Sequence, residues 1–349
     1  MAQQSDGNSM AGIDEAGIET EEQLIAQLTT PSPAVIQAAA ALDGPVVILG
    51  AGGKMGPTLA ELLARAGAEV IAVSRFSRPG LREYLGGAGV GTVAADLMEE
   101  GALRSLPDAG QVLLLAGHKF GSSGNPAATW AVNAELPGRL VARYRGARVI
   151  YVSSGNVYPF SAAASGGSRE TDPVGPVGEY AQSRLGGERL AEYAALKHGT
   201  ALLTVRLFYA AELRYGIIRD IAGRVHAGEP VDLTTGHVNQ IWQGDANAWL
   251  ARSFPLCSNP PEVLNMTGPE VLSVRDIAAA AGAEMGRRPV FAGSEAQTSL
   301  LGNAARLIER LGPPQIAVET MIRWTARWVV MGGRSLGMPT HYEVRSGRF

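Results

Sequence analysis

The stretch VVILGAGGKMG, residues 46–56, joins an unbroken apolar run to a glycine-rich turn. Val46 to Leu49 are β-branched or aliphatic without alternation, which predicts a strand that is buried on both faces. The residues from Thr58 to Ala66 have the composition of a helix. Three glycines, at 50, 53 and 56, therefore stand between a strand and a helix with the spacing G-x-x-G-x-x-G.

Glycine at these three positions has a physical purpose. Gly50 allows the tight turn, Gly53 lets a pyrophosphate approach the main chain, and Gly56 lets the helix pack against the strand. The free N–H groups of the helix start, which include those of Lys54 and Met55, favour an anion. Because the chain has 44 glycines, a turn without a ligand is the rival interpretation.

Outward from this turn, apolar runs alternate with helical segments. This rhythm predicts parallel strands joined by helices, and hence a Rossmann-type, doubly wound α/β sheet over residues 44–207. The expected strands are 46–49, 70–73, 90–94, 112–115, 149–152 and 201–207, and the principal helices are 58–66, 126–144 and 177–197.

The segments on either side of the sheet differ in character. We expect a disordered leader over residues 1–18 and a helical extension over 19–43, with helices 20–28 and 34–42 packed on the edge of the main domain. Residues 208–330 are assigned mainly to substrate binding, with helices near 218–227, 274–285 and 304–311 and no obvious core of their own. Residues 331–349 form a tail that covers the pocket or a neighbouring subunit.

Composition restricts the function. A net charge of -3 gives no general attraction to nucleic acid or to anionic membranes, and no apolar run reaches the length of a membrane span. Cys257 is the single cysteine and has no pattern around it that marks a nucleophile. We assign no metal site, and without a secretory signal we expect a cytoplasmic location.

The end of the second strand bears on cofactor choice. An acidic residue there would receive both ribose hydroxyls of NAD, but this chain has Ser74, followed by Arg75 and then Arg78. Because arginine suits a 2′-phosphate, we expect NADP to be preferred over NAD. The alternative is that both arginines are solvated surface charges.

Several further motifs give the chain a family resemblance. Over residues 45–328 it resembles the extended short-chain dehydrogenase/reductases of the NAD-dependent epimerase/dehydratase family. The resemblance rests on the glycine motif, Asp96, Leu115-Ala116-Gly117, Asn133, Val152–Tyr158, Tyr180, Arg206–Phe208, Gln243–Ala246 and Leu264–Gly268. It implies a nicotinamide cofactor contacted also by Asp96, Leu97, Ala116, Gly117 and Asn133, and a homodimer formed through two long helices.

The resemblance also implies a catalytic set. Ser154 stands where the family orients the substrate oxygen, and Tyr180 stands where the family has its acid/base tyrosine. Four residues later, on the same helix face, the family has a lysine that holds the nicotinamide ribose, but this chain has Arg184. Three interpretations are open: Arg184 replaces the lysine, another base is used, or the dinucleotide is bound without turnover.

Substrate contacts are expected from loops at the strand ends. The candidates are His118, Ser154, Asn156, Tyr209, Arg214 and Trp242. His118 either touches substrate or caps a helix, and Lys119 either supplies the missing ammonium or is solvated. Arg214 and Arg219 either bind a carboxylate or phosphate or are solvated, and Trp242 is equally suited to core packing.

Together these features predict an enzyme. We expect an NAD(P)-dependent reductase, dehydrogenase, epimerase or dehydratase that acts on a sugar or sugar acid by hydride transfer. The alternative is a dinucleotide-binding sensor or scaffold without turnover.

Overall fold

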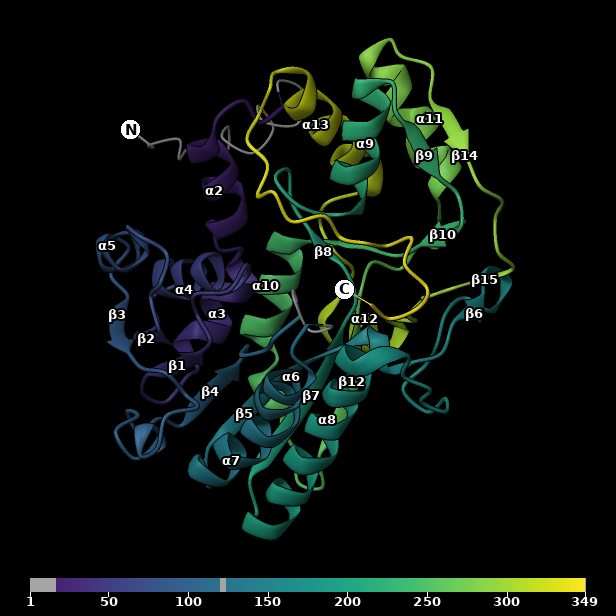
Figure 1. The fold of residues 1–349 in the computed structure, drawn as a ribbon. Helices are drawn as coiled ribbons and strands as arrows, with labels where there is room; N and C mark the ends of the chain where they lie inside the picture. The colour runs from purple at the N-terminus through teal and green to yellow at the C-terminus, as the bar shows by residue number, and fades with distance from the viewer. Residues whose placement is uncertain (1–16, 120–123, 349) are drawn as a thin grey trace, which may run out of the picture.

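A seven-stranded parallel sheet forms the centre of the molecule (Figure 1). The computed structural model describes residues 17–119 and 124–348, so the predicted leader lies almost entirely outside the described residues. The strand order is β12-β7-β5-β4-β1-β2-β3, and every neighbouring pair in it is parallel. This order confirms the predicted doubly wound fold and places its switch point between β1 and β4.

The main-sheet strands are β1 (Val46–Leu49), β2 (Val70–Ser74), β3 (Gly91–Ala94), β4 (Gln111–Leu114), β5 (Arg148–Ser154), β7 (Ala201–Leu207) and β12 (Glu262–Met266). The short strands are β6 (Ser161–Ala162), β8 (Ala210–Ala211), β9 (Pro230–Asp232), β10 (His237–Val238), β11 (Ile241–Trp242), β13 (Leu272–Ser273), β14 (Val290–Ala292) and β15 (Thr298–Ser299). The α-helices are α2 (Glu21–Thr29), α3 (Pro33–Ala40), α4 (Gly56–Arg65), α5 (Leu81–Gly87), α6 (Pro126–Trp130), α7 (Leu136–Arg143), α8 (Gly178–His198), α9 (Ile217–Ala227), α10 (Gln243–Arg252), α11 (Val274–Met285), α12 (Ala305–Leu311) and α13 (Val318–Val330).

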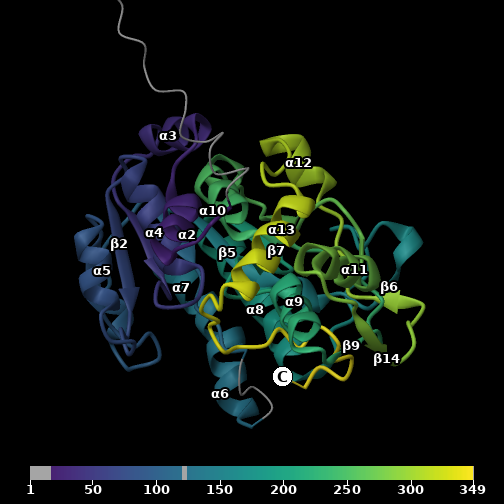
Figure 2. The same cartoon turned by 90° about the horizontal axis from the view of Figure 1, so that it is seen from above.

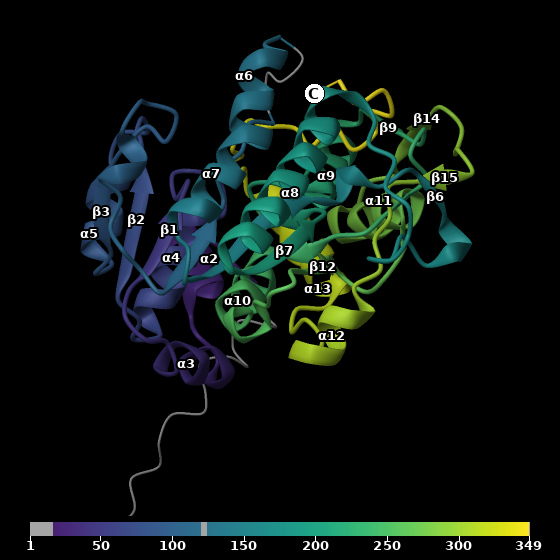
Figure 3. The ribbon, with the colours of Figure 1, turned by 90° about the horizontal axis from the view of Figure 1, so that it is seen from below.

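Both faces of the sheet are buried, which explains the unbroken apolar runs. Val46 and Ile48 of β1 belong to a core shared with α3, α4 and α10. Val47 and Leu49 point to the other face, into a core shared with α7 and α8. Since alternate residues of a strand face opposite sides, a strand covered on both faces must be apolar throughout. Figure 3 shows α7 and α8 side by side on their face.

The seventh strand comes from beyond the predicted sheet segment. β12 pairs with β7 from Glu262↔Leu203 to Met266↔Leu207, so the chain returns to the sheet after residue 208. The apolar runs predict strands only as far as Leu207, and this strand was missed. Glu262 and Asn265 interrupt its apolar residues, so the strand leaves a weak local pattern.

The N-terminal extension packs on the helical layer that covers one face of the sheet. Helix α2 contacts α4 and α10, and α3 contacts α10 (Figure 2). A capping box starts α2: the Thr20 hydroxyl accepts from the Gln23 backbone, and the Gln23 side chain accepts from the Thr20 backbone. Thr29 also donates to Glu61 of α4.

The C-terminal half has a core of its own, which corrects the prediction that it lacks one. Helices α9, α11 and α13 contact one another and bury a cluster that includes Ile221, Ala278 and Trp324. Leu24 and Leu28 of α2 belong to the same cluster, so the N-terminal extension connects the two halves. Among the described residues, no helix is both long and apolar enough to cross a membrane.

Candidate active site

Two cavities meet above the carboxyl ends of β1 and β4, at the switch point of the sheet. The first, of about 430 Å³, lies beside the ends of β2 and β3, and the second, of about 230 Å³, lies beside α8 and β8. Their shared wall is formed by Gly50, Gly53, Leu115, Gly117 and His118. A doubly wound sheet binds its ligands at this position.

Most of the predicted site residues line one or both of these cavities. The first is lined by Gly50, Gly53, Ser74, Arg75, Asp96, Leu97, Ala116, Gly117 and His118. The second is lined by Gly50, Gly53, Lys54, Met55, Gly56, Gly117, His118, Ser154, Asn156, Tyr180, Arg184 and Tyr209.

The three motif glycines have different roles. Gly50 has φ +85°, and a Cβ there would lie 2.6 Å from the Ala116 nitrogen. A Cβ at Gly56 would overlap the Ala51 oxygen, so these two glycines permit close backbone packing. A Cβ at Gly53 would meet only the Gly50 oxygen, at 3.4 Å, and would project into the cavities. Helix α4 begins here without a side-chain cap, which leaves its N–H groups for a ligand.

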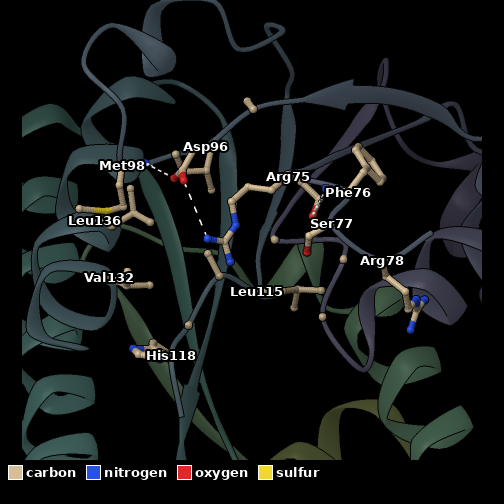
Figure 4. Close-up of a pocket in the computed structure, with 18 of the residues that line it drawn as sticks. Arg75, Phe76, Ser77, Arg78, Asp96, Met98, Leu115, His118, Val132 and Leu136 are labelled. Atoms are coloured by element: carbon tan, nitrogen blue, oxygen red, sulfur yellow. Dashed lines mark hydrogen bonds and ion pairs between the residues drawn. The ribbon is translucent and has the colours of Figure 1, made fainter. Parts of the chain in front are cut away.

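Arginines line the outer end of the first cavity (Figure 4). Arg75 extends toward Asp96, with 3.9 Å between its Nη1 and the carboxylate, while Arg78 points away from this pair. The other oxygen of Asp96 accepts from the Met98 backbone at 3.0 Å. Ser74 packs against the turn, where a Cβ at Gly52 would overlap its Oγ.

A π-helical turn holds the loop that lies over the cleft. The sequence predicts one helix over 126–144, but residues Ala131–Glu135 form a π turn between α6 and α7. Asn133 is buried there and bonds both backbone groups of His118, accepting from its nitrogen at 2.8 Å and donating to its oxygen at 2.9 Å. Asn133 therefore positions the cleft loop from behind instead of lining either cavity.

The catalytic candidates gather in the second cavity. Ser154 ends β5, and its hydroxyl donates to Asn156 Oδ1 at 3.1 Å. Tyr180 lies in the first turn of α8, and Arg184 follows one turn later. The fold thus brings together the three residues to which the family resemblance assigns catalysis.

Arg184 is buried and is bonded to the main chain. Its Nη1 donates to the Ala116 oxygen at 3.3 Å, and its Nη2 donates to the Val152 oxygen. It therefore links the ends of β4 and β5 through two carbonyl groups. Its Nε has no hydrogen-bond partner among the described residues. The Arg184 side chain also lines the second cavity, where a guanidinium N–H can donate to a ligand hydroxyl.

A buried ion pair fixes α8 against the sheet. Arg206 of β7 donates to both carboxylate oxygens of Glu188, with the shortest distance 2.7 Å. Ser153 donates to the same carboxylate at 2.7 Å. Because Glu188 lies one turn beyond Arg184, this pair fixes the helix that carries Tyr180.

Lys54 lines the second cavity and not the first. Its predicted contact with the cofactor is through the backbone N–H at the start of α4, and that assignment stays a prediction. Its ammonium donates to the Ala210 oxygen and lies 4.1 Å from the centre of the Tyr215 ring. Burial lowers the pKa of Lys54 to about 7, and burial also lowers the pKa of Lys119 to about 8.

The structure does not bring two predicted substrate residues into the cleft. Arg214 pairs with Glu212 and, at 3.0 Å, with Glu21, so it joins the N-terminal extension to the second half. Trp242 is buried against Trp324, with ring centres 5.7 Å apart. Both assignments are corrected: ion pairing accounts for Arg214, and core packing accounts for Trp242.

Comparison with known proteins agrees with this architecture. The model of the NAD dependent epimerase/dehydratase family matches residues 46–242, and the chain belongs to that enzyme family. No curated protein matches the chain.

Solved structures resemble it in fold. MoeE5 in complex with UDP-glucuronic acid and NAD is 21% identical, with a TM-score of 0.69, covering 83% of this chain and 100% of that one. The UDP-glucose 4-epimerase of Thermus thermophilus in complex with NAD is 20% identical, with a TM-score of 0.67 and coverage of 81% and 98%. The UDP-glucuronic acid 4-epimerase of Bacillus cereus in complex with UDP-glucuronic acid and NAD is 16% identical, with a TM-score of 0.69 and coverage of 82% and 99%.

Proposed function

We propose that this protein is an NAD(P)-dependent oxidoreductase, epimerase or dehydratase that acts on a sugar or sugar acid. The observation that carries the proposal is that Ser154, Tyr180 and Arg184 line one cavity, which opens onto the glycine-rich turn. The open space at Gly53 and the uncapped start of α4 suit a pyrophosphate. The three solved structures named above hold NAD, and two of them also hold UDP-glucuronic acid.

In this proposal the side chains of the second cavity have separate tasks. The nicotinamide, when bound, supplies the hydride acceptor or donor. Tyr180 moves the proton of the substrate hydroxyl, and Ser154 orients the substrate oxygen. Arg184 fixes the strand ends and donates to a ribose hydroxyl. Titration of intrinsic fluorescence with NADPH, followed by a turnover screen of sugars and sugar acids, tests the whole proposal.

We also propose a preference for NADP over NAD. Ser74, Arg75 and Arg78 line the first cavity, where a cation favours a 2′-phosphate. The contact between Arg75 and Asp96 is long and largely exposed, so it contributes little and a phosphate can displace it.

NADPH is therefore expected to bind more tightly than NADH. Arg75→Ala should reduce the difference in affinity between the two nucleotides. A charged hydrogen bond contributes about 1.5–3 kcal/mol, which corresponds to roughly 10- to 100-fold in affinity. Calorimetry on both nucleotides with both proteins measures the effect. Equal or tighter binding of NADH by the unmodified protein contradicts the preference.

A second candidate function is dinucleotide binding without turnover. It is favoured by Arg184, whose two bonds to carbonyl oxygens suit a structural role. Arginine also cannot lose a proton to a relay as lysine can. A protein that binds NADPH but turns over no member of a broad sugar panel would favour this candidate.

We further propose a homodimer formed through α7 and α8. Leu190, Tyr193 and Leu196 of α8 are exposed apolar side chains, with Tyr193 62% accessible. Trp130 of α6 is also exposed, and α6 packs on α8. Light scattering is expected to give twice the chain mass, and Leu196→Glu with Leu190→Glu should give monomer. A monomer for the unmodified protein contradicts this interface.

A further inference from the structure

The chain almost never uses lysine. It has three lysines, Lys54, Lys119 and Lys197, against twenty-seven arginines. Two of the three line the second cavity. Lysine differs from arginine in that its charge is a compact ammonium that can rotate three donors toward an anion and can lose its proton. A chain that uses arginine almost everywhere has thus placed two ammonium groups in its candidate active site.

The two lysines enter the cavity from different elements. Lys54 comes from the glycine-rich turn and Lys119 from the loop after β4. Each lies over an aromatic ring: Lys54 is 4.1 Å from the Tyr215 ring centre, and Lys119 is 5.6 Å from that of Tyr209. The ring faces favour the cations, and both lysines line the same cavity of about 230 Å³.

The nearby carboxylates are bonded to other groups. Glu212 accepts from the Arg214 side chain at 3.0 Å and from its backbone at 2.8 Å. Asp220 accepts from the Thr340 hydroxyl at 2.6 Å and from its backbone at 2.8 Å. Burial lowers the pKa of both lysines, and the charge of Lys119 adds to that effect at Lys54. A bound anion would act in the opposite direction and favour both ammonium groups.

We propose that Lys54 and Lys119 form an anion-binding subsite that holds a carboxylate or phosphate group of the substrate beside Tyr180. This inference rests on the proposed function and narrows it to acidic substrates. The side chain of Lys54 lies in the second cavity, away from the ribose pocket around Arg75. The subsite therefore serves the substrate, while the backbone of the same turn serves the cofactor.

The scarcity of lysine makes a direct test possible. The protein, saturated with NADPH, is acetylated with a neutral reagent, and the modification of each lysine is followed by mass spectrometry with and without acetate or inorganic phosphate. Lys197 is exposed on α8 and serves as the internal control. We expect one or both anions to slow modification of Lys54 and Lys119 several-fold and to leave Lys197 unchanged. Protection by acetate alone identifies a carboxylate subsite, and protection by phosphate alone identifies a phosphate subsite.

Variants of Lys54 and Lys197 test whether Lys54 and Lys119 bind the anion together. In Lys54→Met, protection of Lys119 should be lost while NADPH binding is retained, and Lys197→Met should change neither. Slower modification with NADPH alone and no further effect of either anion would assign the lysines to the cofactor and overturn the subsite. Equal modification rates with and without anions would also overturn it. Failure of NADPH to bind, by contrast, would contradict the proposed function and not the subsite, because anion protection can be measured on the protein without nucleotide.

Discussion

Tyr180→Phe is expected to lower turnover by about 10²- to 10⁴-fold, the range that proton transfer by a positioned side chain contributes. The change removes one hydroxyl from the second cavity and leaves the ring, so packing in the first turn of α8 should be kept. NADPH affinity should change little, because the hydroxyl serves the reacting oxygen.

The matched control is Tyr193→Phe, which removes a hydroxyl from the same helix outside the second cavity. It should leave turnover unchanged. The measurement is the steady-state rate of product formation from the substrate that the sugar screen identifies. Full activity in Tyr180→Phe would contradict the proton-transfer role, and the family mechanism would then not apply to this chain.

Gly53→Val is expected to lose dinucleotide binding and keep its stability, whereas Gly50→Ala is expected to lose stability. A Cβ at Gly53 meets no protein atom closer than 3.4 Å, so valine should fold normally and fill the space of the pyrophosphate. A Cβ at Gly50 would lie 2.6 Å from the Ala116 nitrogen at a φ of +85°, so alanine should strain the turn. That strain should lower the free energy of unfolding by about 1–3 kcal/mol.

The two variants are compared by thermal unfolding and by NADPH titration. Gly53→Val should keep the wild-type melting temperature and lose detectable NADPH binding. Gly50→Ala should melt at a lower temperature. Retained affinity in Gly53→Val would mean that the phosphates lie elsewhere than at this turn.

The sheet could be predicted because its causes are local. The central strands β1 and β4 are short apolar runs covered on both faces of the sheet, so burial leaves a plain pattern in the sequence. The glycine-rich turn was predictable for the same reason, since positive φ and close backbone approach restrict residue choice. In β12 the polar residues Glu262 and Asn265 interrupt the apolar pattern, and the core of α9, α11 and α13 depends on contacts between distant segments.

The sequence predicted where the site residues lie in the fold better than it predicted the directions of their side chains. Tyr180 and Arg184 share a helix face by spacing alone, and the fold brings Ser154 to them. The direction of Lys54 depends on Ala210 and Tyr215, which are distant from it in the chain. Trp242 and Arg214 have partners, Trp324 and Glu21, that no local pattern indicates. A signal for Lys54 was present in the scarcity of lysine across the chain.

The most direct test of the central claim, that a nicotinamide dinucleotide binds in this cleft, is a crystal structure of the protein grown with NADPH. We expect density for the pyrophosphate over Gly53, for the 2′-phosphate beside Arg75 and for the nicotinamide ring in the second cavity beside Tyr180. Dinucleotide density at any other surface, or none in a crystal grown at saturating NADPH, would contradict it.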